Sequence, residues 1–175
     1  MKPFVKGLLI AAVQVGLVAS LGAKLLYDRA TRPRVWSLAV PYDPNLPIRG
    51  RYVSLQLVVE PRGVRETKLG SVSQPPQTID LRVEGDRLVA EANAHRPAYD
   101  PSDLHLRFIE RRGEKLAVLV EPVAFFITEH ITDPSRRQEG ENLWVEVTIP
   151  KKGPPRPIRL GVKNGDGPII PLELK

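Results

Sequence analysis

The sequence predicts a mainly β protein, in which an N-terminal transmembrane helix is followed by a single antiparallel β-sandwich or partly open β-barrel. Two observations lead to this fold class. Residues 8–23 form an uncharged apolar run, and from Val35 onward short alternating runs are separated by Pro- and Gly-rich breaks. A length of 175 residues allows one domain with a short appendage. We therefore expect a membrane anchor with basic flanks in residues 1–34 and a β-domain in residues 35–175.

The apolar run has the properties of a membrane span. Gln14 and Ser20 are its only polar residues, and apolar character continues to Tyr27. The run then covers about twenty residues, the length that a helix needs to cross about 30 Å of hydrocarbon. Lys24 can extend its ammonium group to the membrane interface, where Tyr27 is also favoured. This predicts a single-pass anchor in the cytoplasmic membrane, with the lipid bilayer as a partner.

Two other interpretations of this run remain open. Lys2 and Lys6 precede it as in a signal peptide, and Ser20 and Gly22 offer small residues for cleavage. A buried helix of a soluble protein is the third interpretation, although the run has no polar face. Basic residues stand on both sides of the run, so the positive-inside rule does not determine its orientation. We expect the usual layout of such anchors, with the bulk of the chain extracytoplasmic.

The remaining residues predict around nine strands. In residues 51–59, Val53, Leu55 and Leu57 alternate with polar side chains, which is typical of a strand with one face on a core. Gly85-Asp86 predicts a tight turn between strands 78–84 and 87–92, and residues 111–114 predict another between 104–110 and 115–121. The other predicted strands are 35–40, 123–128, 143–149, 158–162 and 169–174. Strands at this spacing favour a sandwich or barrel.

Two intervening stretches carry other expectations. Residues 61–77 contain charges, two Gly residues and Pro75-Pro76, which predicts a long exposed loop. Residues 133–139 give the only helical signal after the anchor. There Asp133 can cap a helix and Pro134 can occupy its first position, and Gly140 follows its end.

The net charge of +6 is concentrated around the apolar run. Residues 1–34 hold six basic side chains and one acidic side chain, Asp28, whereas the rest of the chain holds 20 basic and 19 acidic side chains. The basic flanks can attract anionic lipid headgroups. Because the β-domain is close to neutral, we expect no nucleic-acid partner.

The chain has few residues of the types that usually act in catalysis or bind metals. The absence of Cys excludes disulfides, thiolate zinc sites and thiol nucleophiles. His95, His105 and His130 lack metal-ligand spacing, and no nucleophile elbow or phosphate-binding loop occurs. We therefore assign no catalytic, cofactor-binding or metal-binding residue and expect a protein that is not an enzyme. Glu129 and His130, at the end of a predicted strand, form a possible pH-sensitive polar site.

Residues 46–57 resemble the signature of the bacterial GDYXXLXY protein family, which is Gly-Asp-Tyr-x-x-Leu-x-Tyr. Gly50, Tyr52 and Leu55 match, whereas Arg51 replaces Asp and Leu57 replaces the final Tyr. The resemblance covers nearly the whole chain, through the preceding membrane span and the later segments 125–129 and 143–147. It implies a membrane-anchored envelope protein with a small extracytoplasmic β-domain and no established activity.

The resemblance also implies a partner, because members of this family are often found beside multi-pass integral membrane proteins. Arg51 reverses the charge at the position of the family's Asp. Gly50 and Tyr52 also have a structural explanation, since Gly permits a tight strand entry and Tyr packs on a neighbouring strand.

Our leading hypothesis is a non-enzymatic accessory or interaction module for an integral membrane partner, which it contacts through an edge strand or its surface. The alternative is an extracytoplasmic domain that binds or senses a small ligand at a barrel mouth near Arg51, Tyr52, Glu129 and His130. An interaction module predicts an exposed apolar patch or an unpaired edge strand. A ligand-binding domain predicts a closed pocket with convergent polar side chains.

Overall fold

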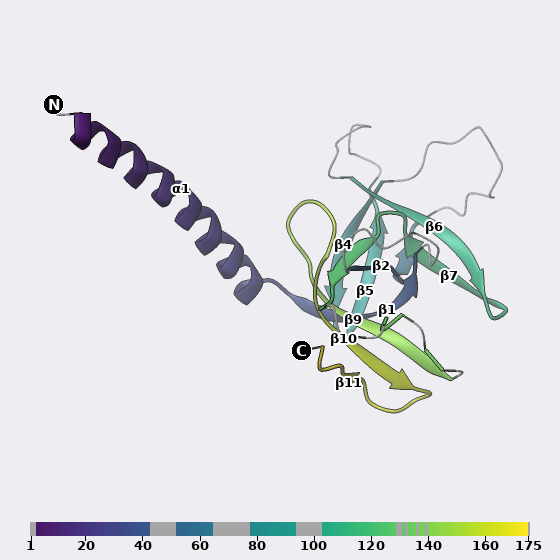
Figure 1. Cartoon of the computed structure of the whole chain (residues 1–175). Coiled ribbons are helices and arrows are strands. Elements are labelled where there is room, and N and C mark those ends of the chain that lie inside the picture. Colours follow the sequence, from purple (N-terminus) through teal and green to yellow (C-terminus); the bar gives the residue numbers. More distant parts are fainter. Residues whose placement is uncertain are drawn as a thin grey trace. The chain divides into compact units, whose positions relative to one another are not determined.

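The computed structural model describes residues 3–42, 52–64, 78–93, 103–128, 131, 133–135, 137–138 and 140–174. The chain divides into two compact units, Met1–Arg32 and Pro33–Lys175. The first unit contains one helix and the second contains the strands, which confirms the predicted mainly β fold class (Figure 1).

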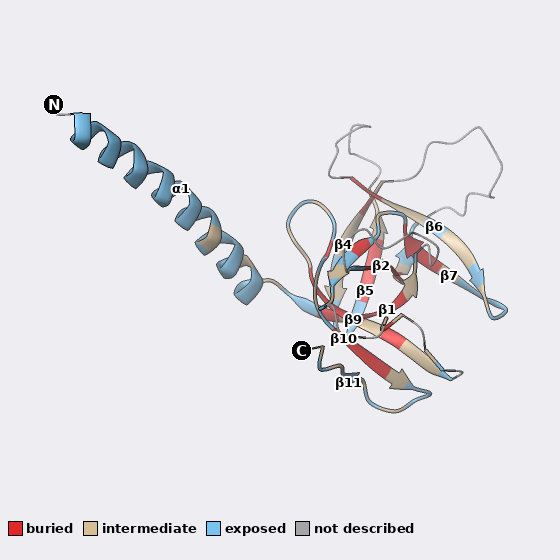
Figure 2. Cartoon of the chain, in the orientation of Figure 1, coloured by how far each residue is buried: buried red, intermediate tan, exposed pale blue. Residues whose placement is uncertain are grey.

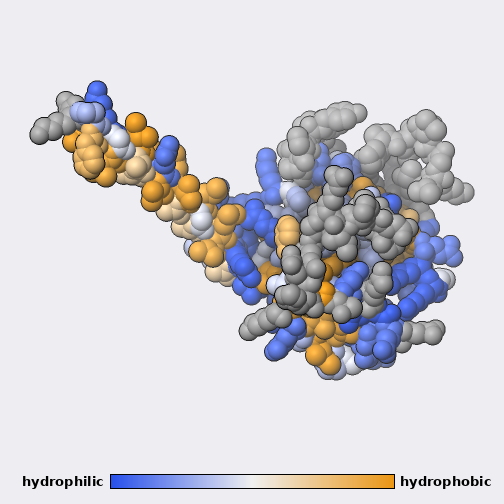
Figure 3. Space-filling view, in the orientation of Figure 1, coloured by the Kyte–Doolittle hydropathy of each residue, from blue (hydrophilic) through white to orange (hydrophobic). Residues whose placement is uncertain are grey.

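Helix α1 (Pro3–Thr31) has 29 residues and none of them is buried. Its length of about 43 Å exceeds the thickness of the hydrocarbon core of a bilayer. The Ser20 hydroxyl donates a hydrogen bond to the Leu17 carbonyl at 2.8 Å, so this polar group is satisfied within the helix. Figures 2 and 3 show a helix that is exposed and apolar along its length. It is long and apolar enough to cross a membrane, as predicted.

The strands form two sheets. The six-stranded sheet has the order β11-β10-β9-β1-β2-β8, and the five-stranded sheet has the order β3-β5-β4-β6-β7. All neighbours are antiparallel except β3 and β5. The strands are β1 (Arg34–Pro41), β2 (Tyr52–Leu57), β3 (Glu60–Arg62), β4 (Thr78–Glu84), β5 (Arg87–Ala92), β6 (Leu104–Arg111), β7 (Glu114–Leu119), β8 (Val123–Phe126), β9 (Glu141–Thr148), β10 (Arg156–Asn164) and β11 (Ile170–Pro171).

The core lies between the two sheets, which are joined through the end of β2. Val53, Leu55 and Leu57 point into the core, as their alternation predicted. Just beyond β2, Val58 forms an antiparallel bridge to Val118 of β7. The six-stranded sheet is curled, so the predicted partly open barrel describes it better than a flat sandwich layer (Figure 1).

Both predicted hairpin turns are present. Gly85 has a φ of 62° between β4 and β5, which a residue without a side chain adopts readily. Between β6 and β7 the turn residues Arg112 and Gly113 have φ values of 53° and 78°. Positive φ at both central positions is the requirement of a type I′ turn, whose twist matches that of the flanking strands. Arg112 is therefore a non-Gly residue in a left-handed conformation.

Two expectations about the intervening stretches are corrected by the structure. Glu60–Arg62, at the start of the predicted loop, forms β3 and pairs in parallel with β5, while residues 65–77 lie outside the described residues. Among the described residues of 133–139 no helix is assigned, and Pro134 and Ser135 form a turn. The Asp133 carboxylate accepts a hydrogen bond from the Ser135 amide at 2.8 Å, as a helix cap would, but the described residues after it form a turn.

Candidate functional site

Two exposed aromatic residues meet at the end of strand β8. Tyr52 on β2 is directly opposite Phe126 on β8, and their ring centroids are 6.2 Å apart with an edge-on angle of 60°. The side chain of Phe126 is 77% exposed and that of Tyr52 is 40% exposed. We call these two residues the aromatic pair. Strand β8 is the last strand of its sheet in the part of the chain that the structure describes.

The predicted motif residues divide between surface and core. Leu55 and Leu57 are fully buried, so these two positions serve packing. Tyr52 lies at the surface in the aromatic pair, where it packs on the neighbouring strand as expected. Gly50, Arg51, Glu129 and His130 lie outside the described residues. The structure therefore gives a surface role within this motif to Tyr52 alone among the motif residues that it describes.

A polar cluster that the sequence did not reveal lies on the face of β2 that also carries Tyr52. Gln56 is 2% exposed, although the alternation placed it on the solvent side. Its Nε2 donates to the Leu119 carbonyl at 2.9 Å, and its Oε1 accepts from Arg107 Nη2 at 2.6 Å. The Arg107 guanidinium also lies 5.8 Å from the ring centre of Tyr42. A buried amide with satisfied donors and acceptors fixes how the two sheets meet.

His105 is hydrogen-bonded to Glu121. Its Nδ1 lies 2.7 Å from Glu121 Oε1, and its backbone N–H donates to Glu121 Oε2 at 3.0 Å. Both side chains are 29% exposed. This pair orders the chain after β7, because Glu121 follows that strand directly.

Both tryptophans lie on the outer face of the six-stranded sheet, next to basic residues of β10. Trp36 is opposite Glu146, which accepts a hydrogen bond from Arg159 Nε at 2.6 Å, and the Arg159 guanidinium lies 5.3 Å from the Trp36 ring centre. Lys163 Nζ lies 5.5 Å from the ring centre of Trp144. These cross-strand contacts stabilise the sheet, because cations are attracted to the faces of aromatic rings.

A cavity of about 300 Å³ lies between β4 and the loop that joins β9 to β10. Its wall includes Asp80 and Arg82 of β4 and Lys151 and Lys152 of the loop. Asp80 accepts a hydrogen bond from Asn93 Nδ2 at 2.7 Å, and Arg82 forms an ion pair with Glu91 at 3.2 Å. The cavity is thus polar and predominantly basic. It does not include the predicted ligand site around Tyr52.

The described residues contain no group of three or more His, Asp or Glu side chains that could hold a metal ion. Two adjacent arginines, Arg111 and Arg112, lie at the β6–β7 turn and affect each other electrostatically. Desolvation, and then the charge of Arg112, lowers the pKa of the Arg111 guanidinium from its ordinary value. The guanidinium nevertheless keeps its charge near neutral pH, since an Arg side chain begins from a very high pKa.

Comparisons with protein-family models, with curated proteins and with solved structures found no match. The resemblance to the GDYXXLXY family therefore stays a prediction.

Proposed function

We propose that this chain is a membrane-anchored accessory protein of the bacterial envelope, which binds an integral membrane partner through the aromatic pair and the adjoining edge strand β8. The observation that supports this proposal is the exposure of Phe126, of which 77% is accessible beside a half-exposed tyrosine. Large aromatic side chains contribute much of the binding energy of protein interfaces. We also propose the extracytoplasmic orientation and the family membership that the sequence suggested.

The position of the aromatic pair suits a partner that extends beyond the bilayer. Strand β1 begins at Arg34, directly after the end of α1, and its eight residues span about 23 Å. Pro41, at the far end of β1, is opposite Leu55 of β2. Because the two strands are antiparallel, Tyr52 at the start of β2 lies beyond that end of β1. The aromatic pair thus lies at the end of the sheet away from the entry of the chain. A partner would reach it with a loop or domain outside the membrane.

Strand β8 gives this contact a specific form. It is a short terminal strand that pairs with β2 from Tyr52 to Leu55 and lies near β10 without pairing with it in the part of the chain that the structure describes. An extended segment of a partner can add to such an edge through backbone hydrogen bonds, while its side chains pack on the aromatic pair. We therefore propose β-strand addition as the mode of binding.

Affinity purification of the full chain from membranes tests this proposal. The substitutions Tyr52→Ser and Phe126→Ser together should reduce recovery of the bound membrane protein by at least about tenfold, because removing two central aromatic side chains costs more than about 1.4 kcal/mol. The matched control is Ile170→Ser, which removes another exposed apolar side chain, 63% accessible, from β11 at the opposite edge of the same sheet.

The control variant should recover the partner as the unchanged chain does. Equal recovery with the double substitution, or an equal loss with Ile170→Ser, would contradict a binding site at β8. Folding of each variant is checked by the fluorescence of Trp36 and Trp144, which both belong to the β-domain.

A further inference from the structure

The end of the β-domain where the chain enters carries a group of basic residues from distant parts of the sequence. Arg34 is opposite Thr148 of β9, and Arg156 of β10 is opposite the same Thr148. The two arginines therefore stand on one face of the sheet, separated by two strand spacings or about 10 Å. Lys151 and Lys152 lie in the loop between β9 and β10. We call Arg34, Lys151, Lys152 and Arg156 the basic margin.

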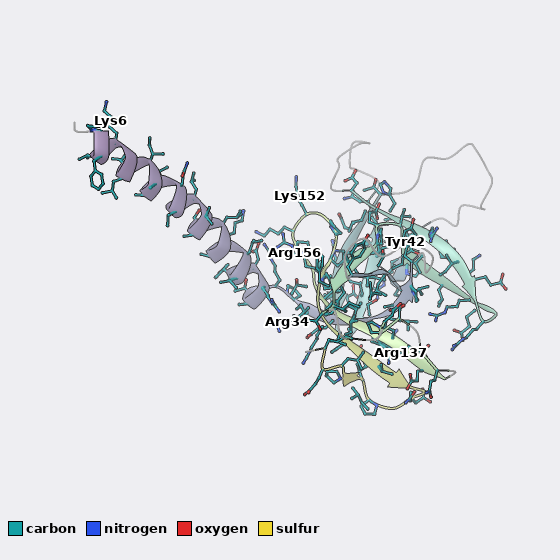
Figure 4. All side chains as sticks on the ribbon, viewed as in Figure 1. Lys6, Arg34, Tyr42, Arg137, Lys152 and Arg156 are labelled. Carbon is teal, nitrogen blue, oxygen red and sulfur yellow. The ribbon has the colours of Figure 1, made fainter. Side chains whose placement is uncertain are left out.

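A backbone hydrogen bond connects the segment that carries the basic margin to Pro33, the first residue of the β-domain. The amide of Ile149 donates a hydrogen bond to the Pro33 carbonyl at 3.3 Å, just before Lys151 in the chain. Figure 4 shows the side chains of Arg34, Lys152 and Arg156 along one margin of the domain. Lys151, Lys152 and Arg156 are exposed.

The segment that carries Lys151, Lys152 and Arg156 is rich in basic residues. No acidic residue occurs between Glu146 and Asp166, whereas five basic residues do. Asp80 is the acidic side chain in the wall of the cavity beside the loop, which two lysines and Arg82 also line. The β-domain as a whole is nearly neutral, so its charge is unevenly distributed, with the basic excess placed where the chain enters.

We infer that the basic margin binds the headgroups of anionic phospholipids in the membrane that α1 enters. The inference builds on the proposed anchor. Arg32 and Pro33 alone separate Thr31, the end of α1, from Arg34, so the length of the chain keeps the Cα of Arg34 within about 10 Å of the end of the helix. That distance is close to one Debye length at physiological salt, within which basic side chains are attracted to an anionic surface.

This contact would restrict how the β-domain stands on the membrane. With the basic margin at the headgroups, β1 leads away from the surface and the aromatic pair lies at the far end of the sheet. Phosphate groups of the lipids would pair with Lys151 and Arg156, and the cavity that Lys151 lines offers room for part of a headgroup. The β-domain would thereby keep one orientation on the membrane and present the same surface to a partner.

The test uses the full chain in lipid nanodiscs, either of phosphatidylcholine alone or with about 30% phosphatidylglycerol. Since the chain has no Cys, a single fluorophore can be attached at Pro154→Cys, which is exposed within the loop. Phosphatidylcholine with a spin label on its headgroup quenches a fluorophore at the membrane surface. The matched site is Asp166→Cys, in the turn after β10, whose nine residues span about 27 Å.

Phosphatidylglycerol should increase quenching at position 154 at least about twofold, and about 1 M salt should remove the increase because the Debye length falls to about 3 Å. The triple substitution Lys151→Glu, Lys152→Glu and Arg156→Glu should also remove it, whereas position 166 should not respond. The control triple substitution Arg111→Glu, Arg112→Glu and Lys115→Glu makes the same charge change at the β6–β7 turn and should leave the increase intact.

Quenching at position 154 that does not depend on phosphatidylglycerol would overturn the inference, as would an equal loss with the control triple substitution. Loss of the quenching at position 154 when a polynucleotide is added at physiological salt would indicate that the basic margin binds nucleic acid instead. Because partner recovery through Phe126 is measured separately, failure of this inference and failure of the proposed function can be distinguished.

Discussion

Helix α1 and the β-domain place their apolar side chains in opposite ways. In α1 the leucines and valines face outward, with Leu17 65% exposed and no residue buried. In the β-domain Leu55, Leu57, Val145 and Leu160 are fully buried between the sheets. Figure 3 shows the same contrast as an apolar helix and a largely hydrophilic domain surface.

The two units therefore need different surroundings. The β-domain buries its apolar surface internally, so its stability comes from its own packing in water. Helix α1 satisfies its backbone internally and leaves its apolar side chains exposed, which is the situation that a bilayer resolves.

Removal of residues 1–32 should convert the chain from a membrane-bound to a soluble, folded protein. The deletion ends at the boundary between the two units and keeps the hydrogen bond from Ile149 to Pro33. Vesicle flotation should find the full chain with the lipid and the truncated chain in the soluble fraction. Circular dichroism should show β structure in the truncated chain. An insoluble or unfolded product would mean that the helix contributes to the fold of the domain.

The substitution Leu55→Ala should destabilise the β-domain by about 2–5 kcal/mol, because it leaves a cavity in a close-packed core. The same change at Leu17 of α1 should leave unfolding of the domain unchanged, since that side chain contacts no core. Urea unfolding of the full chain in mild detergent, followed by tryptophan fluorescence, measures both variants. The fluorescence reports on the β-domain because both tryptophans lie in it. Equal effects of the two substitutions would contradict the separation.

A smaller effect is expected from adding one methyl group at a glycine. A Cβ at Gly161 would lie 2.7 Å from Cγ2 of Ile169 and 3.0 Å from the Trp36 ring, so Gly161→Ala should destabilise the domain by about 1–3 kcal/mol. A Cβ at Gly16 of α1 would meet no atom within 4 Å. Gly16→Ala should therefore leave the midpoint of domain unfolding unchanged. An unchanged midpoint for Gly161→Ala would show that Ile169 moves aside freely.

Much of the fold was predictable from local patterns. The strands β4 and β5 match their predicted bounds, since Gly85-Asp86 marks their turn and branched or apolar residues fill both sides. Strand β3 was missed, because three residues containing a proline have no periodicity, and only the neighbouring β5 gives them a partner. The helical signal at Asp133 and Pro134 was misleading, since the same residue types also favour a turn.

The candidate sites depended more on tertiary structure. Tyr52 was singled out from the sequence, but its contact with Phe126 follows from the pairing of β2 with β8, which are 66 residues or more apart. Gln56 was placed on the solvent side because alternation assigns faces within one strand. Its burial results from the approach of Arg107 and the carbonyl of Leu119, which belong to the other sheet.

The sequence by itself determined that this protein has an apolar helix long enough to cross a membrane and a β-domain with a buried face on each main strand. These properties follow from the order of residues along a segment, because hydrophobic length and alternation are local. Tertiary structure decided that Phe126 stays exposed beside Tyr52 and that Arg34 shares one margin with Lys151, Lys152 and Arg156. Those groupings arise from strand pairing between distant segments, whose partners a local pattern does not specify.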